Sequence, residues 1–370
     1  MVAGEASGDL LAGLLLDGMH QRWPDARYEG IGGPEMARRG FHAWWPHDKL
    51  AVRGYVEVLR HYREIVGIRK QLKDRLLKSP PRAFIGVDVP DFNLDLEADL
   101  KTAGIRTVHF VCPSIWAWRP ERVEKIRRSC DHVLCIFPFE PELLAREGIA
   151  STYVGHPLAN VIPMEADKAA ARRALGLDAD ALVLAVLPGS RASEVAFHAR
   201  LFLDAAALLR KARPALQLIV PVIPALRPVI EAAARACGLT NLQVIDGQSH
   251  AALAACDLAL VASGTATLEA ALFKRPMVIS YKVNWLTYRI MWPKHLQPWI
   301  GLPNILCGEF AVPELLQDAA KAPALASALL EWLEAPARMA AVQEKFRAMH
   351  LTLQRDTASL ATNAIEQVIA

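Results

Sequence analysis

Two turns in this chain combine glycine, serine and charged residues in a way that suits phosphate or sugar binding. One lies in residues 2–16 (VAGEASGDLLAGLLL) and the other in residues 182–205 (LVLAVLPGSRASEVAFHARLFLDA). Each follows an apolar run typical of a β-strand and opens a helix with apolar periodicity. Such a turn directs backbone N–H groups and the positive end of a helix to one place, which suits a phosphate group. Two copies indicate two α/β domains facing each other across a cleft.

The first turn carries negative charge. Glu5 and Asp9 would repel a bare phosphate, so we expect this turn to contact hydroxyl groups of a sugar through Gly4, Glu5 and Ser7. The alternative is a plain helix start, in which Ser7 is the N-cap and Asp9 interacts with the helix dipole.

The second turn carries a cation instead. Arg191 presents a planar guanidinium that can bind two phosphate oxygens at once, so Gly189, Ser190 and Arg191 are expected to bind a diphosphate. The alternative is a surface arginine that pairs with Glu194.

A third glycine turn follows the apolar run 258–261. Hydroxyl groups of Ser263, Thr265 and Thr267 around Gly264 can reach phosphate oxygens, and Glu269 in the following helix can accept two ribose hydroxyls. The alternative is an N-capped helix without a ligand.

Asp88 is the candidate general base. It ends the strand-like run Ala83–Val87, and the carboxyl ends of strands are where α/β folds place their chemistry. A carboxylate there can remove a proton from an attacking hydroxyl group. Asp91 follows closely but precedes a helix, so its role is better explained as a cap.

The composition limits the class of protein. The chain has 370 residues, 53% of them hydrophobic and 22% charged, with a net charge of +3, which indicates a packed protein of about two domains and no nucleic-acid partner. We expect no membrane-spanning helix and no signal peptide. Six cysteines without a CxxC pair and eleven histidines without ligand spacing predict reduced thiols and no metal.

Strand-like and helical segments alternate along both halves, which predicts parallel sheets covered on both faces. Residues 151–165 interrupt the alternation, so we expect a first Rossmann-like domain over 1–160 and a second over 161–339. A C-terminal helix at about 340–370 is expected to return to the first domain. Only three residues precede Gly4, so the first strand is short and should cost stability.

The segment 54–72 predicts an amphipathic helix with basic residues. Its apolar residues cover more of the circumference than one buried face requires, so Val56, Val58, Leu59 and Tyr62 are expected to face a membrane surface. The alternative is an ordinary helix packed on the domain. Residues 285–300 share this aromatic and basic character, and their tryptophans could anchor at an interface or simply pack.

Together and in order, these motifs make the chain resemble the lipid-A-disaccharide synthases, inverting glycosyltransferases of the GT-B fold. The resemblance covers essentially the whole chain. The motifs that carry it are AGEASG with Asp9, GVDVPDFNL, PSIWAWRP with Arg122 and Val123, YVGHP, LPGSRASEV, SGTATLEAAL and GLPNIL.

The resemblance implies a reaction and roles for residues. UDP-2,3-diacylglucosamine donates its sugar to 2,3-diacylglucosamine 1-phosphate (lipid X), forming a β-1,6 link and UDP without a metal or other cofactor. Asp88 would be the base, Arg191 and the turns at Gly189 and Gly264 would stabilise the diphosphate, and Glu269 would hold the ribose. Asn304 would contact the donor, a role implied by the resemblance alone.

The resemblance also implies a peripheral protein on the cytoplasmic face of the inner membrane of Gram-negative bacteria. It would be a homodimer, with the C-terminal part exchanged between protomers as one arrangement. Two other functions remain open from the sequence: a related GT-B enzyme such as a UDP-N-acetylglucosamine epimerase or another sugar transferase, and a nucleotide-binding module without catalysis.

Overall fold

The computed structural model describes residues 1–4, 6–50 and 55–370, and its account of side chains leaves out residues 6, 55–62, 286, 290 and 291. The chain divides into two compact units. Unit 1 comprises Met1–Asn160 with Thr352–Ala370, and unit 2 comprises Val161–Leu351. Among the described residues, no helix combines the length and apolar character that crossing a membrane requires.

Unit 1 is built on a seven-stranded sheet in the order β3-β2-β1-β4-β5-β6-β7. Every neighbouring pair is parallel, as the predicted alternation of strands and helices requires. The short strand β1 pairs with both of its neighbours in the middle of the sheet. The strands are β1 Val2–Ala3, β2 Glu29–Gly32, β3 His42–Pro46, β4 Ala83–Val87, β5 Arg106–Phe110, β6 His132–Cys135 and β7 Ser151–Tyr153. The helices are α1 Ala6–Arg22, α2 Pro34–Ala37, α3 Tyr55–Lys78, α4 Pro90–Thr102, α5 Arg122–Ser129, α6 Glu140–Arg146, α7 Leu158–Val161 at the boundary, α17 Thr357–Ile369 and the 3₁₀ turn η1 His47–Leu50.

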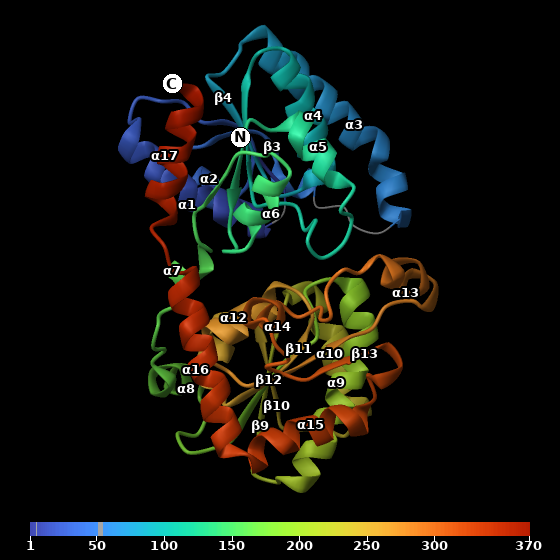
Figure 1. Ribbon diagram of the computed structural model, residues 1–370. Helices are drawn as coiled ribbons and strands as arrows, with labels where there is room; N and C mark the ends of the chain where they lie inside the picture. The colour runs from blue at the N-terminus through green and yellow to red at the C-terminus, as the bar shows by residue number, and fades with distance from the viewer. Residues whose placement is uncertain (5, 51–54) are drawn as a thin grey trace. The chain divides into compact units, whose positions relative to one another are not determined.

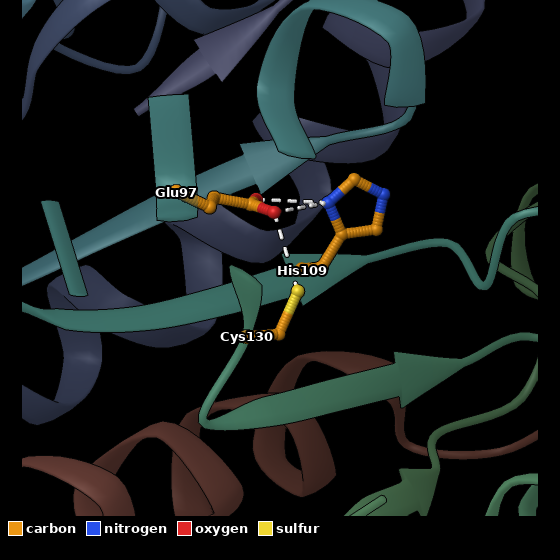
Figure 2. A group of neighbouring side chains, drawn as sticks. All are labelled: Glu97, His109 and Cys130. Carbon is orange, nitrogen blue, oxygen red and sulfur yellow. Dashed lines mark hydrogen bonds and ion pairs between the residues drawn. The ribbon is translucent and has the colours of Figure 1, made fainter. Parts of the chain in front are cut away.

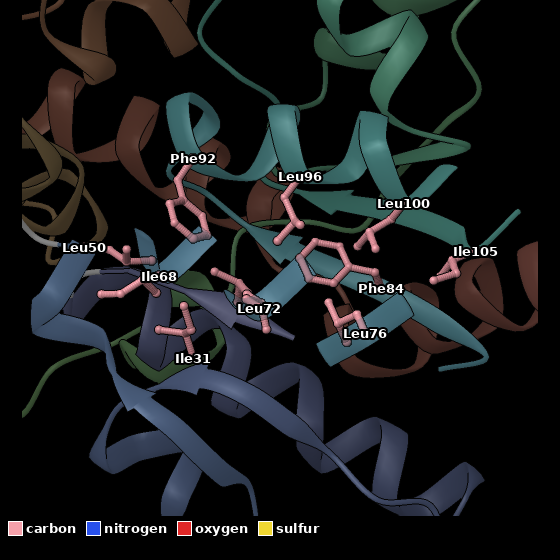
Figure 3. Packing of buried hydrophobic residues seen from close by; sticks show 11 residues of the cluster. Ile31, Leu50, Ile68, Leu72, Leu76, Phe84, Phe92, Leu96, Leu100 and Ile105 are labelled. Carbon is pink, nitrogen blue, oxygen red and sulfur yellow. The ribbon is translucent and has the colours of Figure 1, made fainter. Parts of the chain in front are cut away.

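The core of unit 1 explains the second half of α3. Ile68, Leu72 and Leu76 are buried against Phe84 of β4 and Leu96 of α4, as Figure 3 shows. From there to its end, α3 is therefore an ordinary packed helix, which is the alternative left open by the sequence. The side chains of Val56, Val58, Leu59 and Tyr62 lie outside the described residues.

The last helix of the chain, α17, belongs to unit 1. It packs beside α1, as Figure 1 shows, and the two helices are joined by an ion pair between Arg22 and Glu366. Arg22 also donates to Oδ1 of Asn363 at 2.7 Å. The backbones approach closely at Gly18, where an added Cβ would lie 2.7 Å from the carbonyl oxygen of Ala358. Glycine at this position is therefore what allows α17 to dock.

Unit 2 is built on a six-stranded sheet in the order β10-β9-β8-β11-β12-β13, again parallel throughout. Its central strands β8 and β11 are buried along their whole length, as expected for a sheet covered on both faces. The strands are β8 Val183–Leu187, β9 Gln217–Val222, β10 Leu242–Asp246, β11 Leu258–Ala262, β12 Met277–Tyr281 and β13 Glu314–Leu316. The helices are α8 Lys168–Leu175, α9 Ala192–Ala212, α10 Arg227–Ala236, α11 Ser249–Ala255, α12 Thr265–Leu272, α13 Trp285–Met291, α14 Leu302–Cys307, α15 Ala322–Glu334 and α16 Pro336–Leu353, with 3₁₀ turns η2 Pro224–Leu226, η3 Trp292–Lys294 and η4 Gln317–Ala319.

The docking of α17 can be tested with one substitution. Gly18→Ala should lower the melting temperature, because the new methyl group would push α17 away at a cost of about 1–3 kcal/mol. Gly67→Ala in α3 is the matched control, since no atom lies within 4 Å of its added Cβ. This control should raise stability by about 0.5–1 kcal/mol, as expected for glycine replaced inside a helix. Equal gains in both variants, measured by thermal unfolding, would show that the contact at Gly18 is not tight.

Candidate functional site

Asp88 lies where β4 ends, in a strained backbone conformation. Asp88 has φ 53° and Val89 has φ 44°, so two consecutive residues with side chains occupy the left-handed region. For a β-branched residue such as Val89 this conformation is a genuine outlier, and such strain gathers at functional sites. The Asp88 side chain is partly exposed, and no described residue donates a hydrogen bond to its carboxylate.

Asn93 of α4 holds this turn from behind. Its side-chain amide donates to the carbonyl oxygen of Asp88 at 2.8 Å and lies 3.4 Å from the carbonyl oxygen of Val2. The approach depends on Gly86 in β4, because an added Cβ there would lie 2.9 Å from Cβ of Asn93. Asn93 lies in the GVDVPDFNL motif but is not among the site residues predicted from the sequence.

One turn further along α4, Glu97 forms a buried cluster with His109 of β5 and Cys130, shown in Figure 2. Oε1 of Glu97 is 2.8 Å from Nδ1 of His109, and the Cys130 thiol donates to Oε2 at 3.2 Å. An added Cβ on Gly86 would lie 2.1 Å from Oε1 of Glu97. The cluster therefore links α4 to β4, to β5 and to the start of β6.

This cluster has ligand types that suit zinc, but its geometry favours a hydrogen-bond network. It offers three ligands within 4.8 Å of one another, whereas a structural zinc site uses four. The imidazole Nε2 has no partner among the described residues, and a metal-bound histidine almost always donates through its second nitrogen. The nitrogen and oxygen already lie at hydrogen-bond distance from each other.

The first glycine turn lies beside Asp88, because β1 pairs with β4 from Ala3 to Val87. An added Cβ on Gly4 would lie 3.0 Å from the side chain of Val89, so the turns are in contact. Ser7 is exposed, and Glu5 lies outside the described residues.

The structure gives Asp9 a role that the sequence did not predict. Its buried carboxylate accepts hydrogen bonds from the backbone N–H groups of Gly33 at 2.8 Å, Glu35 at 2.8 Å and Met36 at 3.1 Å. It therefore caps α2 from another element and cannot reach a sugar.

The N–H groups of the second turn are not free, contrary to the prediction. Oε2 of Glu194 accepts from the N–H of Ser190 at 3.1 Å, and Oε1 pairs with the Arg191 guanidinium at 2.7 Å. Gly189 has φ 120°, and an added Cβ would lie 2.6 Å from Cβ of Glu194. Glu194 thus accepts hydrogen bonds from the N–H groups that precede α9 and forms an ion pair with Arg191. The Arg191 side chain remains 41% exposed.

The third turn opens α12. The first N–H groups of this helix, at Thr265 and Ala266, precede any intrahelical partner, and no described atom lies within 4 Å of a Cβ added to Gly264. The side chain of Glu269 is mostly covered and lies 3.5 Å from Nε2 of His250. The Ser263 hydroxyl lies 3.4 Å from the carbonyl oxygen of Ile300.

Two predicted donor contacts prove to be internal. The hydroxyl of buried Thr267 donates to the carbonyl oxygen of Gly264, three residues earlier, at 2.8 Å, so its proton is not available to a phosphate. Asn304 is fully buried and its amide bonds the backbone of Val312 and the carboxylate of Glu314. Glu314 in turn accepts from the N–H of Gly301 at 2.9 Å. The GLPNIL motif therefore braces the start of α14.

The PSIWAWRP motif forms the loop after β5, beside the Asp88 turn. The Arg119 and Arg122 guanidinium groups lie 4.3 and 5.9 Å from the centre of the Trp118 ring, and both pair with the Asp91 carboxylate. Trp116 donates to Oε1 of Glu140 at 3.0 Å. In the sequence the motif supports only the resemblance, although Arg119 within it and Arg122 just after it, close to Trp118, are a signal for an anion site.

Other parts of the chain bear on the remaining expectations. All six cysteines are free, four of them buried and Cys237 and Cys307 partly exposed. In unit 2, Trp285 is 67% exposed, and Trp292 and Leu296 are also exposed. A surface hollow of about 500 Å³ lies at the amino ends of β9 and β10, away from the glycine turns, which follow the carboxyl ends of β8 and β11.

A family model described as lipid-A-disaccharide synthetase matches residues 1–368. A lipid-A-disaccharide synthase from Albidiferax ferrireducens is 68% identical over 375 residues, covering 100% of this chain and 96% of the relative.

Solved structures bear on the fold. A putative UDP-N-acetylglucosamine 2-epimerase from Listeria monocytogenes has a TM-score of 0.62 at 13% identity, covering 100% of this chain and 94% of that one. A glycosyltransferase involved in lipopolysaccharide biosynthesis has a TM-score of 0.57 at 14% identity, covering 100% and 98%. The predicted fold class, two parallel-sheet Rossmann-like domains of GT-B type, is confirmed.

The carboxyl group of Glu140 predicts a pH effect on stability. Burial raises its pKa to about 8, although the N–H groups of Phe137, Trp116 and Ile136 oppose the shift. The folded protein then binds the proton more tightly than the unfolded chain does. The stabilisation is full below the ordinary pKa near 4.5 and is lost as the pH rises through about 8.

Glu140→Gln should therefore reduce the fall in stability between pH 5 and 8.5 by up to about 4 kcal/mol. Thermal unfolding of the wild type and the variant across this range is the measurement. Glu142→Gln, which changes an exposed carboxylate of the same helix, should keep the wild-type slope. Parallel slopes for all three proteins would assign the pH dependence to other groups.

Proposed function

The chain belongs to the lipid-A-disaccharide synthase family, and we propose that Asp88 is the base of its reaction. The enzyme transfers 2,3-diacylglucosamine from UDP-2,3-diacylglucosamine to 2,3-diacylglucosamine 1-phosphate and releases UDP. The observation that carries the assignment is the strained turn at Asp88 and Val89, with a carboxylate to which no described residue donates a hydrogen bond. The hydrogen bond from Asn93 to the carbonyl oxygen of Asp88 stabilises this strained turn.

The proton and the electron pairs can be followed through this step. Asp88 takes the proton of the acceptor's 6-hydroxyl group, and that oxygen attacks the anomeric carbon of the donor. The new C–O bond forms as the bond to the diphosphate breaks, so the configuration inverts to β. We assign contact with the acceptor sugar to the turn beside Asp88, where Ser7 is exposed and Gly4 is buried, and Glu5 keeps this role as a prediction.

We assign the leaving diphosphate to unit 2. Arg191 and the free N–H groups at the start of α12 supply positive charge where negative charge develops, and we propose that this replaces a metal ion. Ser190 donates to Glu194, so a diphosphate must compete with this carboxylate for the turn. Glu269 would accept the ribose hydroxyls, and Ser263 and Thr265 would contact the phosphates.

We propose that the protein works on the cytoplasmic face of the inner membrane, since both substrates carry acyl chains. The exposed aromatic residues of the segment 285–300, with Arg289 stacked 5.3 Å from the ring centre of Trp285, support contact with an anionic surface. A homodimer remains part of the proposal and rests on the family alone. In the structure α17 packs on unit 1 of its own chain.

Asp88→Asn tests the base. The wild type should release UDP only when both acylated substrates are present, and the variant should be slower by about 10²–10⁴-fold because proton removal is lost. UDP binding, measured by calorimetry, should be unchanged. Near-normal turnover of the variant would remove Asp88 from the mechanism. UDP release by the wild type with an unacylated donor, or without an acceptor, would instead contradict the assigned reaction.

Arg191→Ala tests the diphosphate contact. Loss of a charge-assisted hydrogen bond should weaken UDP binding by about 10–100-fold. Arg200→Ala is the matched control, because Arg200 lies on the same helix and pairs with Asp204 on the surface. Calorimetry that finds equal UDP affinity in both variants would exclude Arg191 from the donor site.

A further inference from the structure

We propose that Arg119 and Arg122 bind the phosphate group of the acceptor, an assignment that rests on the proposed function. We call these two residues the arginine pair. Both lie close to the Trp118 ring and pair with the Asp91 carboxylate. Nothing in the reaction as described above uses this cluster, although the acceptor differs from the transferred sugar by a phosphate that the enzyme has to accommodate.

The arginine pair lies near the proposed base, because both arginines contact Asp91. Asp91 follows Asp88 by three residues and lies in the first turn of α4, whereas Arg119 lies in the loop after β5 and Arg122 is the first residue of α5. These strands are neighbours in register, and the backbone N–H of Asp88 donates to the carbonyl oxygen of Phe110 at 2.9 Å. A ligand that presents a hydroxyl group to Asp88 therefore has its other groups close to this loop.

The charges in the cluster do not balance. Two guanidinium groups share one carboxylate, since Arg119 and Arg122 both pair with Oδ1 of Asp91. The Asp91 side chain is 76% exposed, so little holds it in place beyond these pairs. A phosphate monoester carries a charge of about −1.5 to −2 at neutral pH and three acceptor oxygens. It would therefore compete effectively with a single carboxylate for the two guanidinium groups.

The guanidinium groups are also held in place before any ligand arrives. Each lies close to the Trp118 ring, which restricts long side chains that otherwise lose conformational entropy on binding. Arg119 has φ 57°, a strained backbone conformation at the end of the motif. Strain and stacking together indicate a loop shaped for a ligand and not only for an ion pair.

The choice between the two phosphate-bearing substrates follows from the position of the base. The donor's diphosphate is assigned to Arg191 in unit 2, whereas the acceptor's hydroxyl group is assigned to Asp88 in unit 1. The arginine pair belongs to the same sheet edge as Asp88. It therefore serves the acceptor, and it would let the enzyme prefer a sugar 1-phosphate to the same sugar without phosphate.

Kinetics with two acceptors test this proposal. We expect the wild type to prefer 2,3-diacylglucosamine 1-phosphate to 2,3-diacylglucosamine in kcat/KM, and Arg119→Ala to reduce this preference by about 10–100-fold. The rate with the unphosphorylated acceptor should hardly change. Arg119→Lys, which keeps the charge, should retain part of the preference. Arg128→Ala, which changes a 70% exposed arginine of α5, should keep all of it. An equal loss with both acceptors, or no loss with either, would overturn the proposal.

Binding of a soluble probe separates this proposal from the proposed function. Glucosamine 1-phosphate should bind the wild type, measured by calorimetry, and bind Arg119→Ala more weakly, while UDP should not displace it. Displacement by UDP would place the phosphate in the donor site and contradict the assignment. A wild type that binds the probe through Arg119 but transfers no sugar would contradict the proposed reaction alone.

Discussion

The close approach of α4 to β4 at Gly86 is the contact on which the candidate site depends. A side chain at this position would collide with Asn93 and Glu97, so only glycine lets both reach the sheet. The amide of Asn93 then donates a hydrogen bond to the carbonyl oxygen of Asp88. Glu97 is hydrogen-bonded to His109 in β5 and to Cys130, just before β6. One helix face thus ties three neighbouring strands together. The strained turn of Asp88 and Val89 can persist because these hydrogen bonds of α4 fix the backbone around it.

The two units use the same device with different chemistry. Both place their polar turns after the carboxyl ends of parallel strands, where the first N–H groups of the next helix lack partners. In unit 2 the turn that opens α12 leaves these groups available, whereas Glu194 already satisfies those that open α9. In unit 1 the polar edge holds the proposed base, Asp88, and the arginine pair. The proposed division between acceptor and donor therefore follows from the side chains, since the backbone plan is shared.

Local sequence patterns predicted the parts of the molecule that local sequence controls. The alternation of apolar strands and periodic helices predicted two parallel α/β domains, and the end of a strand made Asp88 the candidate base, which stays a prediction. The patterns failed where a partner comes from elsewhere in the fold. Asp9 caps α2, which begins 25 residues later, and Asn304 is bound to residues after α14, so neither is available to a ligand. The sequence offers Glu194 as a partner of Arg191 only as the alternative to a diphosphate contact, and spacing alone cannot show that Glu194 also accepts from the N–H groups of the turn. The role of Gly86 could not be predicted, because it depends on how closely α4 approaches β4, and no local sequence pattern describes that distance.

The position of α17 has a consequence for the synthesis of this protein on the ribosome. Unit 1 is made of residues 1–160 and 352–370. The surface of α1 that contacts α17 therefore stays uncovered until the whole of unit 2 has been translated. At roughly 5–20 residues per second, this delay is on the order of 10–40 seconds. Unit 2 is one continuous segment, so all of its residues have been synthesised before the last residues of unit 1. The second unit is therefore able to complete its fold first, although it comes later in the sequence.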